Sequence, residues 1–118
     1  MKTPSVGIDI VDVARVGRLV RNPRFVGRVF SDREVAYCRE KKNAAQHFAV
    51  RFAAKEAVYK ALGIAGVAHK EISVRNAPSG KPRVELSTRL KKHEPRFSLS
   101  LSHTATQAVA VAVYSPVP

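Results

Sequence analysis

The sequence contains one cysteine, no tryptophan and few other aromatic residues, and acidic side chains are scarce. A single cysteine, Cys38, cannot form an internal disulfide. It lies in a segment predicted to be helical, without neighbours that would activate it, so we expect a structural thiol. The scarcity of aromatic residues removes most of the stacking groups that a nucleic-acid-binding module needs.

Long hydrophobic runs are also missing, because no stretch approaches the roughly 18 apolar residues that a membrane-spanning helix requires. The N-terminal stretch MKTPSVGIDIVDVARV carries Asp9 and Asp12 inside its apolar part, and both would be excluded from the core of a signal peptide. We therefore expect a cytoplasmic protein. With 118 residues, 45% of them apolar, we expect residues 1–118 to form a single domain with its own core.

Positive charge is abundant: 21 lysines and arginines against nine acidic residues give a net charge of +12. Much of the excess lies between residues 15 and 42. Such a surface attracts polyanions, so nucleic acid, an anionic membrane or an acidic protein would each fit. A solvated basic surface that keeps the protein in solution fits equally well, and charge alone does not choose among these alternatives.

The first half of the chain predicts a strand followed by helices. SVGIDIVDV is typical of a strand, and DVARVGRLVRN has helical spacing of its apolar residues until Pro23 breaks the helix. The segment SDRE is a capping-box signature, in which Ser31 and Glu34 begin a helix that runs to about Lys42. NAAQ repeats this device at the start of a long helix, which Gly63 ends.

The second half predicts strands. EISVRNA, RVEL, RFSLSLSHT and QAVAVAVYS have strand patterns, and the last two form a hairpin. STRLKKHE predicts a short helix capped by Ser87 and stopped by Pro95. We therefore expect an α+β fold in which the long helix packs on an antiparallel sheet.

The long helix contains RFAAKEAVYKALG, residues 51–63, in which Glu56 and Lys60 interrupt an apolar sequence. Helical geometry gathers the small residues on one face, namely Val50, Ala53, Ala54, Ala57 and Ala61. Glu56 and Lys60 lie about 40° apart beside this face. One interpretation is a solvated ion pair one turn apart, which contributes only about 0.2–0.5 kcal/mol.

Asp9 supports a second interpretation, because it lies within an apolar strand between Ile8 and Ile10. If Asp9 faced water, strand alternation would expose Val11 and turn Asp12 inward, which is a poor pattern. A cation held between Asp9 and Glu56 would explain both carboxylates. Two hard oxygen ligands with open positions suit Mg²⁺, which usually takes its other ligands from water and phosphates.

A phosphate near this cation would lie within reach of Lys60, one helical turn after Glu56. Other candidates to face the phosphate are Arg51 and Lys55 in the helix, Lys81 in NAPSGKP, and Ser102, His103 and Thr104 at a strand end. Each is weak evidence alone, because a single strand-end histidine is more often structural and the residues of NAPSGKP are turn formers first.

Taken together, GIDIVDVARV, RFAAKEAVYKALG, NAPSGKP and SLSH resemble the holo-acyl-carrier-protein synthase family, the short bacterial type of 4′-phosphopantetheinyl transferase. The resemblance extends from Val6 to the last strand. It implies a 4′-phosphopantetheinyl transferase-like fold and transfer of the phosphopantetheine arm of coenzyme A to a serine of apo acyl carrier protein. Adenosine 3′,5′-bisphosphate is the other product, and Mg²⁺ is required.

The resemblance also implies residue roles and an assembly. Asp9 and Glu56 are the implied metal ligands, and Lys60 contacts the pyrophosphate. The implied contacts to the 3′-phosphate ribose are Arg51, His103 and Thr104, and those beside the adenine are Gly80 and Pro82. The short type is typically a homotrimer whose neighbouring subunits share each active site. Two residues depart from the usual pattern: Asp12 replaces a frequent Glu, and Tyr59 replaces a frequent Ser.

Carrier proteins of this kind are strongly acidic, which gives the basic segment a specific interpretation. Arg15, Arg18 and Arg21 lie on the helix that follows the Asp9 strand, and Arg24 and Arg28 extend the patch. We expect these arginines to receive the carrier protein, with neither nucleic acid nor membrane as partner. The general base stays open among Glu56, Asp9 and a metal-bound water. The alternative function is a small basic domain that binds nucleic acid or acidic proteins without catalysis.

Overall fold

The computed structural model describes residues 3–116, so the outermost residues of the predicted domain, 1, 2, 117 and 118, lie outside it. Its elements are β1 (Ser5–Asp12), α1 (Val13–Leu19), α2 (Pro23–Val29), α3 (Asp32–Arg39), α4 (Ala44–Leu62), the 3₁₀ turn η1 (His69–Glu71), β2 (Ile72–Asn76), β3 (Pro82–Leu86), the 3₁₀ segment η2 (Thr88–Arg96), β4 (Phe97–His103) and β5 (Gln107–Tyr114). This arrangement confirms the predicted α+β class. Within residues 3–116, no helix is both long and apolar enough to cross a membrane.

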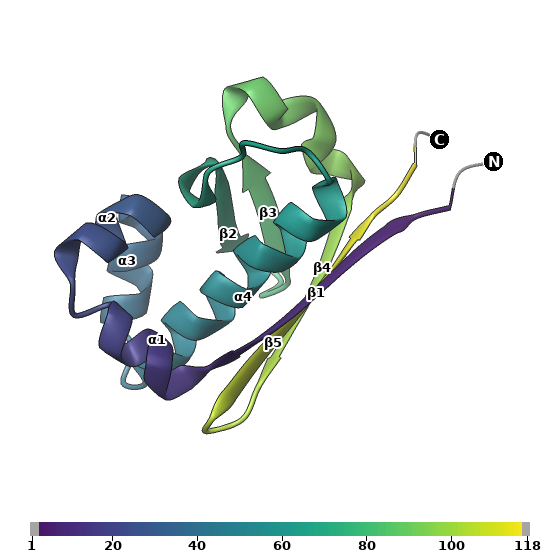
Figure 1. Ribbon diagram of the computed structural model, residues 1–118. Helices are drawn as coiled ribbons and strands as arrows, with labels where there is room; N and C mark the ends of the chain where they lie inside the picture. The colour runs from purple at the N-terminus through teal and green to yellow at the C-terminus, as the bar shows by residue number, and fades with distance from the viewer. Residues whose placement is uncertain (1–2, 117–118) are drawn as a thin grey trace.

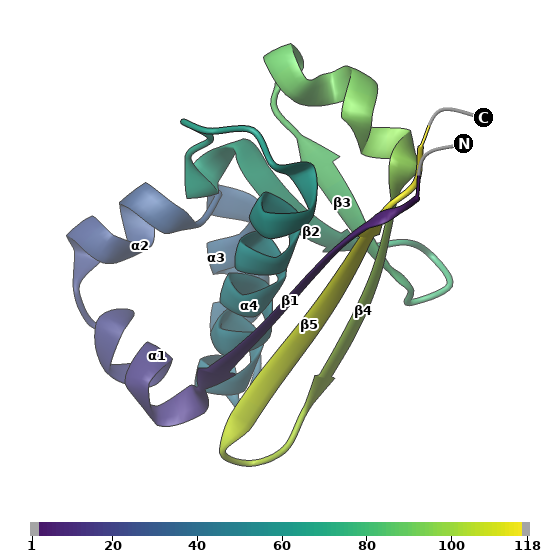
Figure 2. The same cartoon turned by 45° about the vertical axis from the view of Figure 1, so that its right-hand side comes forward.

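The strands form two antiparallel sheets instead of the single sheet expected from the sequence (Figure 1). One sheet has the order β1-β5-β4, so the first strand joins the edge of the C-terminal hairpin. The other is the hairpin β2-β3. Figure 2 shows α1, α2 and α3 on one side of α4 and the three-stranded sheet on the other. The long helix therefore packs on an antiparallel sheet, as predicted, and lies between that sheet and the shorter helices.

Close packing of small residues holds α4 on the three-stranded sheet. Ala53, Ala54 and Ala57 of the helix are completely buried, and so are Ala108 and Ala110 of β5. This confirms the predicted small-residue face. The helix approaches β1 even more closely: a Cβ atom on Gly7 would stand 1.9 Å from the backbone oxygen of Ala57. Only glycine fits at this contact.

The helix boundaries agree with the sequence where a local capping signal is present. Ser31 and Glu34 form the predicted capping box: Ser31 Oγ accepts from the Glu34 amide at 3.2 Å, and Glu34 Oε1 accepts from the Ser31 amide at 3.0 Å. This third helix ends at Arg39, short of the predicted Lys42. Gly63 ends α4 in the left-handed conformation, with φ of +67°, as predicted.

Three local predictions were wrong. The first helix ends at Leu19, before the predicted break at Pro23, and Pro23 instead begins α2, because proline is favoured at the first helical position and the Asn22 side chain accepts from the Arg24 amide at 2.9 Å. Asn43 makes no side-chain cap on α4, so NAAQ is not a second capping box. STRLKKHE forms a 3₁₀ segment that runs through Pro95, and Ser87 makes no side-chain cap on it.

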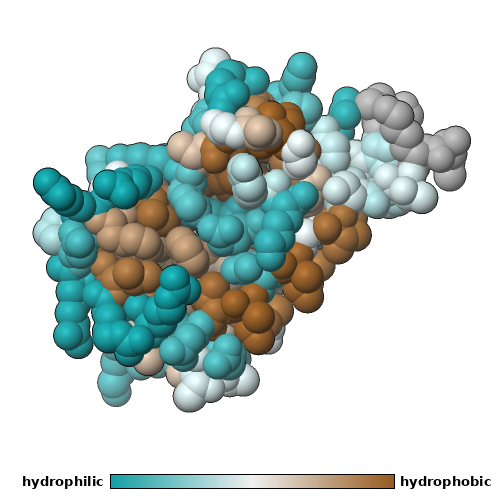
Figure 3. Space-filling model, in the orientation of Figure 1, coloured by the Kyte–Doolittle hydropathy of each residue, from teal (hydrophilic) through white to brown (hydrophobic). Residues whose placement is uncertain are grey.

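The outward side of the three-stranded sheet is apolar along β1 and β5, whereas β4 contributes exposed serines there. Val6, Ile8 and Ile10 of β1 are 60%, 59% and 62% exposed. Their cross-strand partners are Val113, Val111 and Val109 of β5, and we call these six residues the outer sheet face. Figure 3 shows a hydrophobic band along the edge of the molecule where β1 lies. A water-facing Asp9 would have exposed Val11 on the same side of the strand. The structure shows the opposite alternation, because Gly7 and Val11 are buried against the helix.

Candidate active site

Asp9 and Lys60 are brought together by the close approach of β1 to α4. Asp9 lies two residues after Gly7, so strand alternation puts both on the side that faces the helix. Its side chain is only 17% exposed, and Lys60 Nζ lies 3.2 Å from Asp9 Oδ1 and 2.9 Å from the backbone oxygen of Ile8. A water-facing Asp9 is therefore excluded. The Lys60 side chain itself is half-exposed and can reach solvent.

Glu56 lies one turn before Lys60 but contacts a different residue. Its Oε1 atom lies 2.5 Å from Nε2 of His69, a residue that the sequence analysis did not single out. His69 begins the turn η1, thirteen residues after Glu56, and its ring stacks on Phe52 with centroids 5.6 Å apart. No local sequence signal marks this contact, since it depends on how the loop after Gly63 returns to the helix.

The donor set around Asp9 and Glu56 fits a hard cation. Within residues 3–116 no group of three His, Cys, Asp or Glu side chains could hold a metal, so a zinc-type cluster is not found there. Magnesium needs fewer protein ligands, because one or two carboxylates suffice when phosphates and water complete its coordination. The Lys60 ammonium that now pairs with Asp9 is half-exposed, so it can move away and leave the carboxylate to a cation. Metal binding by Asp9 and Glu56 stays a prediction.

A second group of predicted residues lies around Arg51, on a different side of α4. Arg51 is 4% exposed, and its guanidinium carbon lies 4.2 Å from the centroid of the Tyr37 ring. Lys41 Nζ also lies over this ring, at 4.6 Å. The Nε atom of Arg51 is buried and has no hydrogen-bond partner among the described residues. Two cations thus surround one aromatic ring, and a buried donor is left unsatisfied.

The turn between β2 and β3 joins this second group. Asn76 Nδ2 donates to the Tyr37 hydroxyl at 3.1 Å, which ties the end of β2 to α3. Gly80 has φ of +88°, as its turn requires, and Pro82 begins β3 opposite Asn76. Gly80 and Pro82 therefore lie on the side of the molecule that carries Arg51.

His103 and Thr104, at the end of β4, lie near the same group. The His47 ring packs edge-on against Tyr37 with centroids 5.8 Å apart, and burial together with the charges of Arg51, Lys41 and His103 lowers the pKa of His47. His103 is exposed. Thr104 Oγ1 accepts from the amides of Thr106 and Gln107 at 3.2 and 3.0 Å, so the hydroxyl already shapes the turn.

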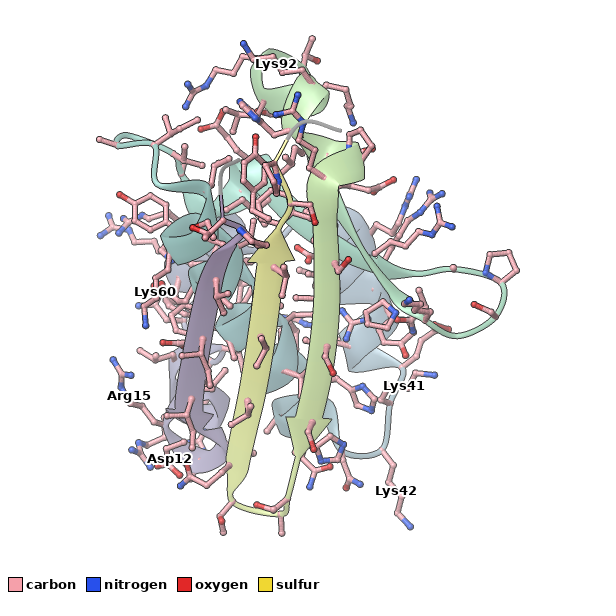
Figure 4. All side chains as sticks on the ribbon, turned by 90° about the vertical axis from the view of Figure 1, so that its right-hand side faces the viewer. Asp12, Arg15, Lys41, Lys42, Lys60 and Lys92 are labelled. Atoms are coloured by element: carbon pink, nitrogen blue, oxygen red, sulfur yellow. The ribbon has the colours of Figure 1, made fainter. Side chains whose placement is uncertain are left out.

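The two groups occupy opposite edges of the three-stranded sheet. β1 and β4 pair with the two sides of β5, so Asp9 and His103 stand on different edges. Figure 4 shows Lys60 and Arg15 beside β1 and Lys41 beside β4. One chain therefore assembles the Asp9–Lys60 pair and the Arg51 group separately, and it does not bring all the predicted site residues into one cleft.

Lys55 does not face a phosphate, contrary to its expected role. Its side chain is completely buried, with Nζ 2.7 Å from Glu34 Oε1. The ammonium also donates to the backbone oxygens of His69 and Ile72. Burial lowers the pKa of Lys55, and Glu34 opposes this effect. The pair joins α3, α4 and the start of β2, so its role is structural.

Cys38 is also structural, as expected, because it is completely buried. Burial raises the pKa of its thiol to about 11, which leaves little reactive thiolate.

The arginines of the predicted carrier-binding patch are exposed. They lie on α1, on α2 and in the turn between these helices, namely Arg15, Arg18, Arg21, Arg24 and Arg28. Because α1 follows β1 directly, these arginines begin next to the strand that carries Asp9 (Figure 1).

Comparison with known proteins agrees with the motifs. The model of the 4′-phosphopantetheinyl transferase superfamily matches residues 5–113. A holo-[acyl-carrier-protein] synthase of Geotalea daltonii is 43% identical over 117 residues, covering 91% of this chain and 94% of the relative. That of Geobacter sulfurreducens is 42% identical, with coverage of 91% and 93%.

Solved structures of similar proteins agree as well. The holo-[acyl-carrier-protein] synthase of Neisseria meningitidis superposes with a TM-score of 0.85 at 31% identity, covering 95% of this chain and 98% of its own. That of Helicobacter pylori, solved in complex with coenzyme A, has a TM-score of 0.81 at 33% identity, with coverage of 93% and 99%. The chain therefore belongs to the 4′-phosphopantetheinyl transferase superfamily.

Proposed function

We propose that this protein transfers the 4′-phosphopantetheine group of coenzyme A to a serine of apo acyl carrier protein, releasing adenosine 3′,5′-bisphosphate. The observation that carries the proposal is the contact at Gly7, which sets Asp9 of β1 against the turn of α4 that bears Glu56 and Lys60. These residues belong to the two motifs that define the resemblance. Relatives across the full chain are holo-[acyl-carrier-protein] synthases, which agrees with this chemistry.

Asp9 and Glu56 would hold Mg²⁺, which when bound neutralises negative charge on the pyrophosphate. Lys60 has a long half-exposed side chain whose ammonium now pairs with Asp9. By rotating toward the substrate, it can stabilise the charge that develops on the leaving bisphosphate. Phosphoryl transfer depends mainly on positioning and charge stabilisation, so this small set of groups suffices. Removing one such electrostatic contact typically costs about 10²–10³ in rate.

The Arg51 group would bind the other end of coenzyme A. An unsatisfied buried donor costs free energy, and a bound anion would satisfy Arg51 Nε. Arg51, His103 and Thr104 are proposed to bind the 3′-phosphate ribose. Gly80 and Pro82, in the turn tied to Tyr37, are proposed to lie beside the adenine.

A homotrimer would unite the two groups. Asp9 lies on β1 and His103 lies on β4, at opposite edges of one sheet. The axes of these two strands are separated by two inter-strand spacings, about 10 Å. In a closed ring, the β1 edge of one subunit meets the β4 edge of the next, which brings an Asp9–Lys60 pair to a neighbouring Arg51 group. The outer sheet face supports an assembly, because monomers rarely expose a continuous apolar patch without a partner.

The exposed arginines 15, 18, 21, 24 and 28 are proposed to receive the acidic carrier protein beside the Asp9 edge. Complementary charge of this kind speeds association and weakens with salt. Neither nucleic acid nor a membrane is a proposed partner. The cytoplasmic location stays a prediction from the sequence.

The test is a mass measurement on an apo acyl carrier protein incubated with the enzyme, coenzyme A and Mg²⁺. We expect a gain of about 340 Da, the mass of one phosphopantetheine arm, as phosphoryl transfer to the carrier serine requires. Excess chelator and Glu56→Ala should each abolish the gain. Glu40→Ala, which changes an exposed glutamate at the end of α3, should leave it intact. No gain with any of several carriers would favour the non-catalytic binding alternative.

A further inference from the structure

We infer that His69 is a positioning residue that orients the Glu56 carboxylate for metal binding, an inference that rests on the proposed function. The geometry points to this role because His69 Nε2 lies 2.5 Å from Glu56 Oε1. Glu56 Oε2 makes no hydrogen bond or ion pair with any described residue, so one oxygen is fixed and the other is free for a cation.

The direction of this hydrogen bond follows from the chemistry of the two groups. A carboxylate offers only acceptors, so Nε2 of His69 carries the proton and donates. A neutral imidazole can therefore hold the carboxylate without a full positive charge beside it. A lysine or arginine at position 69 would instead compete with the metal. Hydrogen-bonded partners of this kind typically change metal affinity about 10–100-fold when they are removed.

The His69 ring is itself held in place from several directions. It stacks on Phe52 with an interplanar angle of 16°, and Phe52 packs on Phe25 with centroids 6.0 Å apart. The backbone oxygen of His69 accepts from the buried Lys55 ammonium at 3.3 Å. Lys70, the next residue, donates from Nζ to the backbone oxygen of Gly27 at 3.0 Å. A donor anchored in this way presents one orientation, and it therefore restricts the rotamers of Glu56.

The same contacts distinguish this role from that of a simple surface pair. An exposed ion pair typically contributes little to stability. Here the carboxylate side chain is 29% exposed and the imidazole is 41% exposed, and the pair lines a cavity of about 230 Å³ together with Tyr59 and Val67. The hydrogen-bonded pair therefore lines a cavity that is open to solvent.

The experiment measures metal affinity without turnover. Mn²⁺ is titrated into the protein saturated with coenzyme A, with no carrier protein present, and free Mn²⁺ is followed by electron paramagnetic resonance. We expect His69→Ala to weaken Mn²⁺ binding about 10-fold or more. His69→Gln retains an N–H donor and should recover most of the affinity. The matched control is His93→Ala, which removes a half-buried histidine bonded to the Tyr114 hydroxyl at 2.6 Å.

Unfolding of each variant is recorded in parallel, so that a folding defect is separated from a weakened site. Unchanged Mn²⁺ affinity in His69→Ala would overturn the inference, as would equal losses in the Ala and Gln variants or a loss in His93→Ala. An unsubstituted protein that transfers the arm but fails to bind Mn²⁺ would also overturn it. The carrier mass assay decides the proposed function separately, because it uses only the unsubstituted protein, the chelator and the Glu56 variant.

Discussion

Substitution of Gly7 by alanine tests whether the contact of β1 with α4 builds the active site. The added Cβ would lie 1.9 Å from the Ala57 oxygen and 2.9 Å from the Ala61 nitrogen. These are backbone atoms of a helix interior, so they cannot rotate away as a flexible side chain would. To restore an ordinary contact, β1 and α4 must separate locally by about 1.5 Å.

Two effects should follow from this separation. Overpacking of a tight contact costs about 1–3 kcal/mol and occasionally more, and a backbone obstacle favours the upper end of that range. The same movement carries Asp9 away from Glu56 and Lys60, and a misplacement of about 1 Å can cost about 100-fold in rate. We therefore expect Gly7→Ala to lose about 3 kcal/mol in urea unfolding and about 100-fold in kcat of the folded fraction.

Gly27→Ala provides the matched control, because nothing lies within 4 Å of the added Cβ and the residue is inside α2. Alanine is favoured over glycine in a helix by about 0.5–1 kcal/mol, so this variant should be as stable as the original protein or more so. A Gly7→Ala protein that unfolds at the same urea concentration and keeps its kcat would refute the reasoning. The site would then not depend on the contact at Gly7.

Three other predictions concern separate surfaces and contacts. Arg15→Glu should raise the KM for the carrier protein far more than the KM for coenzyme A in steady-state kinetics. The control Arg39→Glu on α3 should change neither KM. Equal effects of Arg15→Glu on both substrates would contradict carrier docking at α1. Lys55→Met should destabilise the fold by about 3–5 kcal/mol, because Glu34 would be left buried and unpaired, and adding Glu34→Gln should recover part of this loss in urea unfolding. Ile8→Lys should convert the assembly to monomers in light scattering and abolish transfer; an unchanged mass would argue against the outer sheet face as an interface.

The features that could be predicted from the sequence depend on residues close together in the chain. The capping box at Ser31 needs only a partner three residues later, and Gly63 needs only its own backbone conformation. The small-residue face of α4 follows from helical periodicity. Pro23 shows where such signals become ambiguous, since a proline can either end one helix or begin the next, and here α1 has already ended at Leu19. Asn22, directly before Pro23, is the local signal that favours a helix start, and its side chain makes that cap in the structure.

The features that were missed depend on contacts between distant residues. Lys55 looked like a charge available to a phosphate, yet it neutralises Glu34 from another helix, and nothing near either residue signals the pairing. His69 contacts Glu56 only because the loop after Gly63 folds back along α4. The candidate metal ligands could nevertheless be proposed, because Asp9 and Glu56 each interrupt an apolar pattern that would otherwise exclude a charge.

The alternation that would turn Asp9 toward water was rejected from the sequence, and the structure agrees with that rejection. Within one chain, the helix side of β1 carries Gly7, Asp9 and Val11, and the strand exposes its larger apolar residues, Ile8 and Ile10. That arrangement is poor for a monomer and reasonable for a sheet that packs on copies of itself. The same face lies between the edge that carries Asp9 and the edge that carries His103. Covering the outer sheet face and completing the active site would therefore be one event, and loss of one should bring loss of the other.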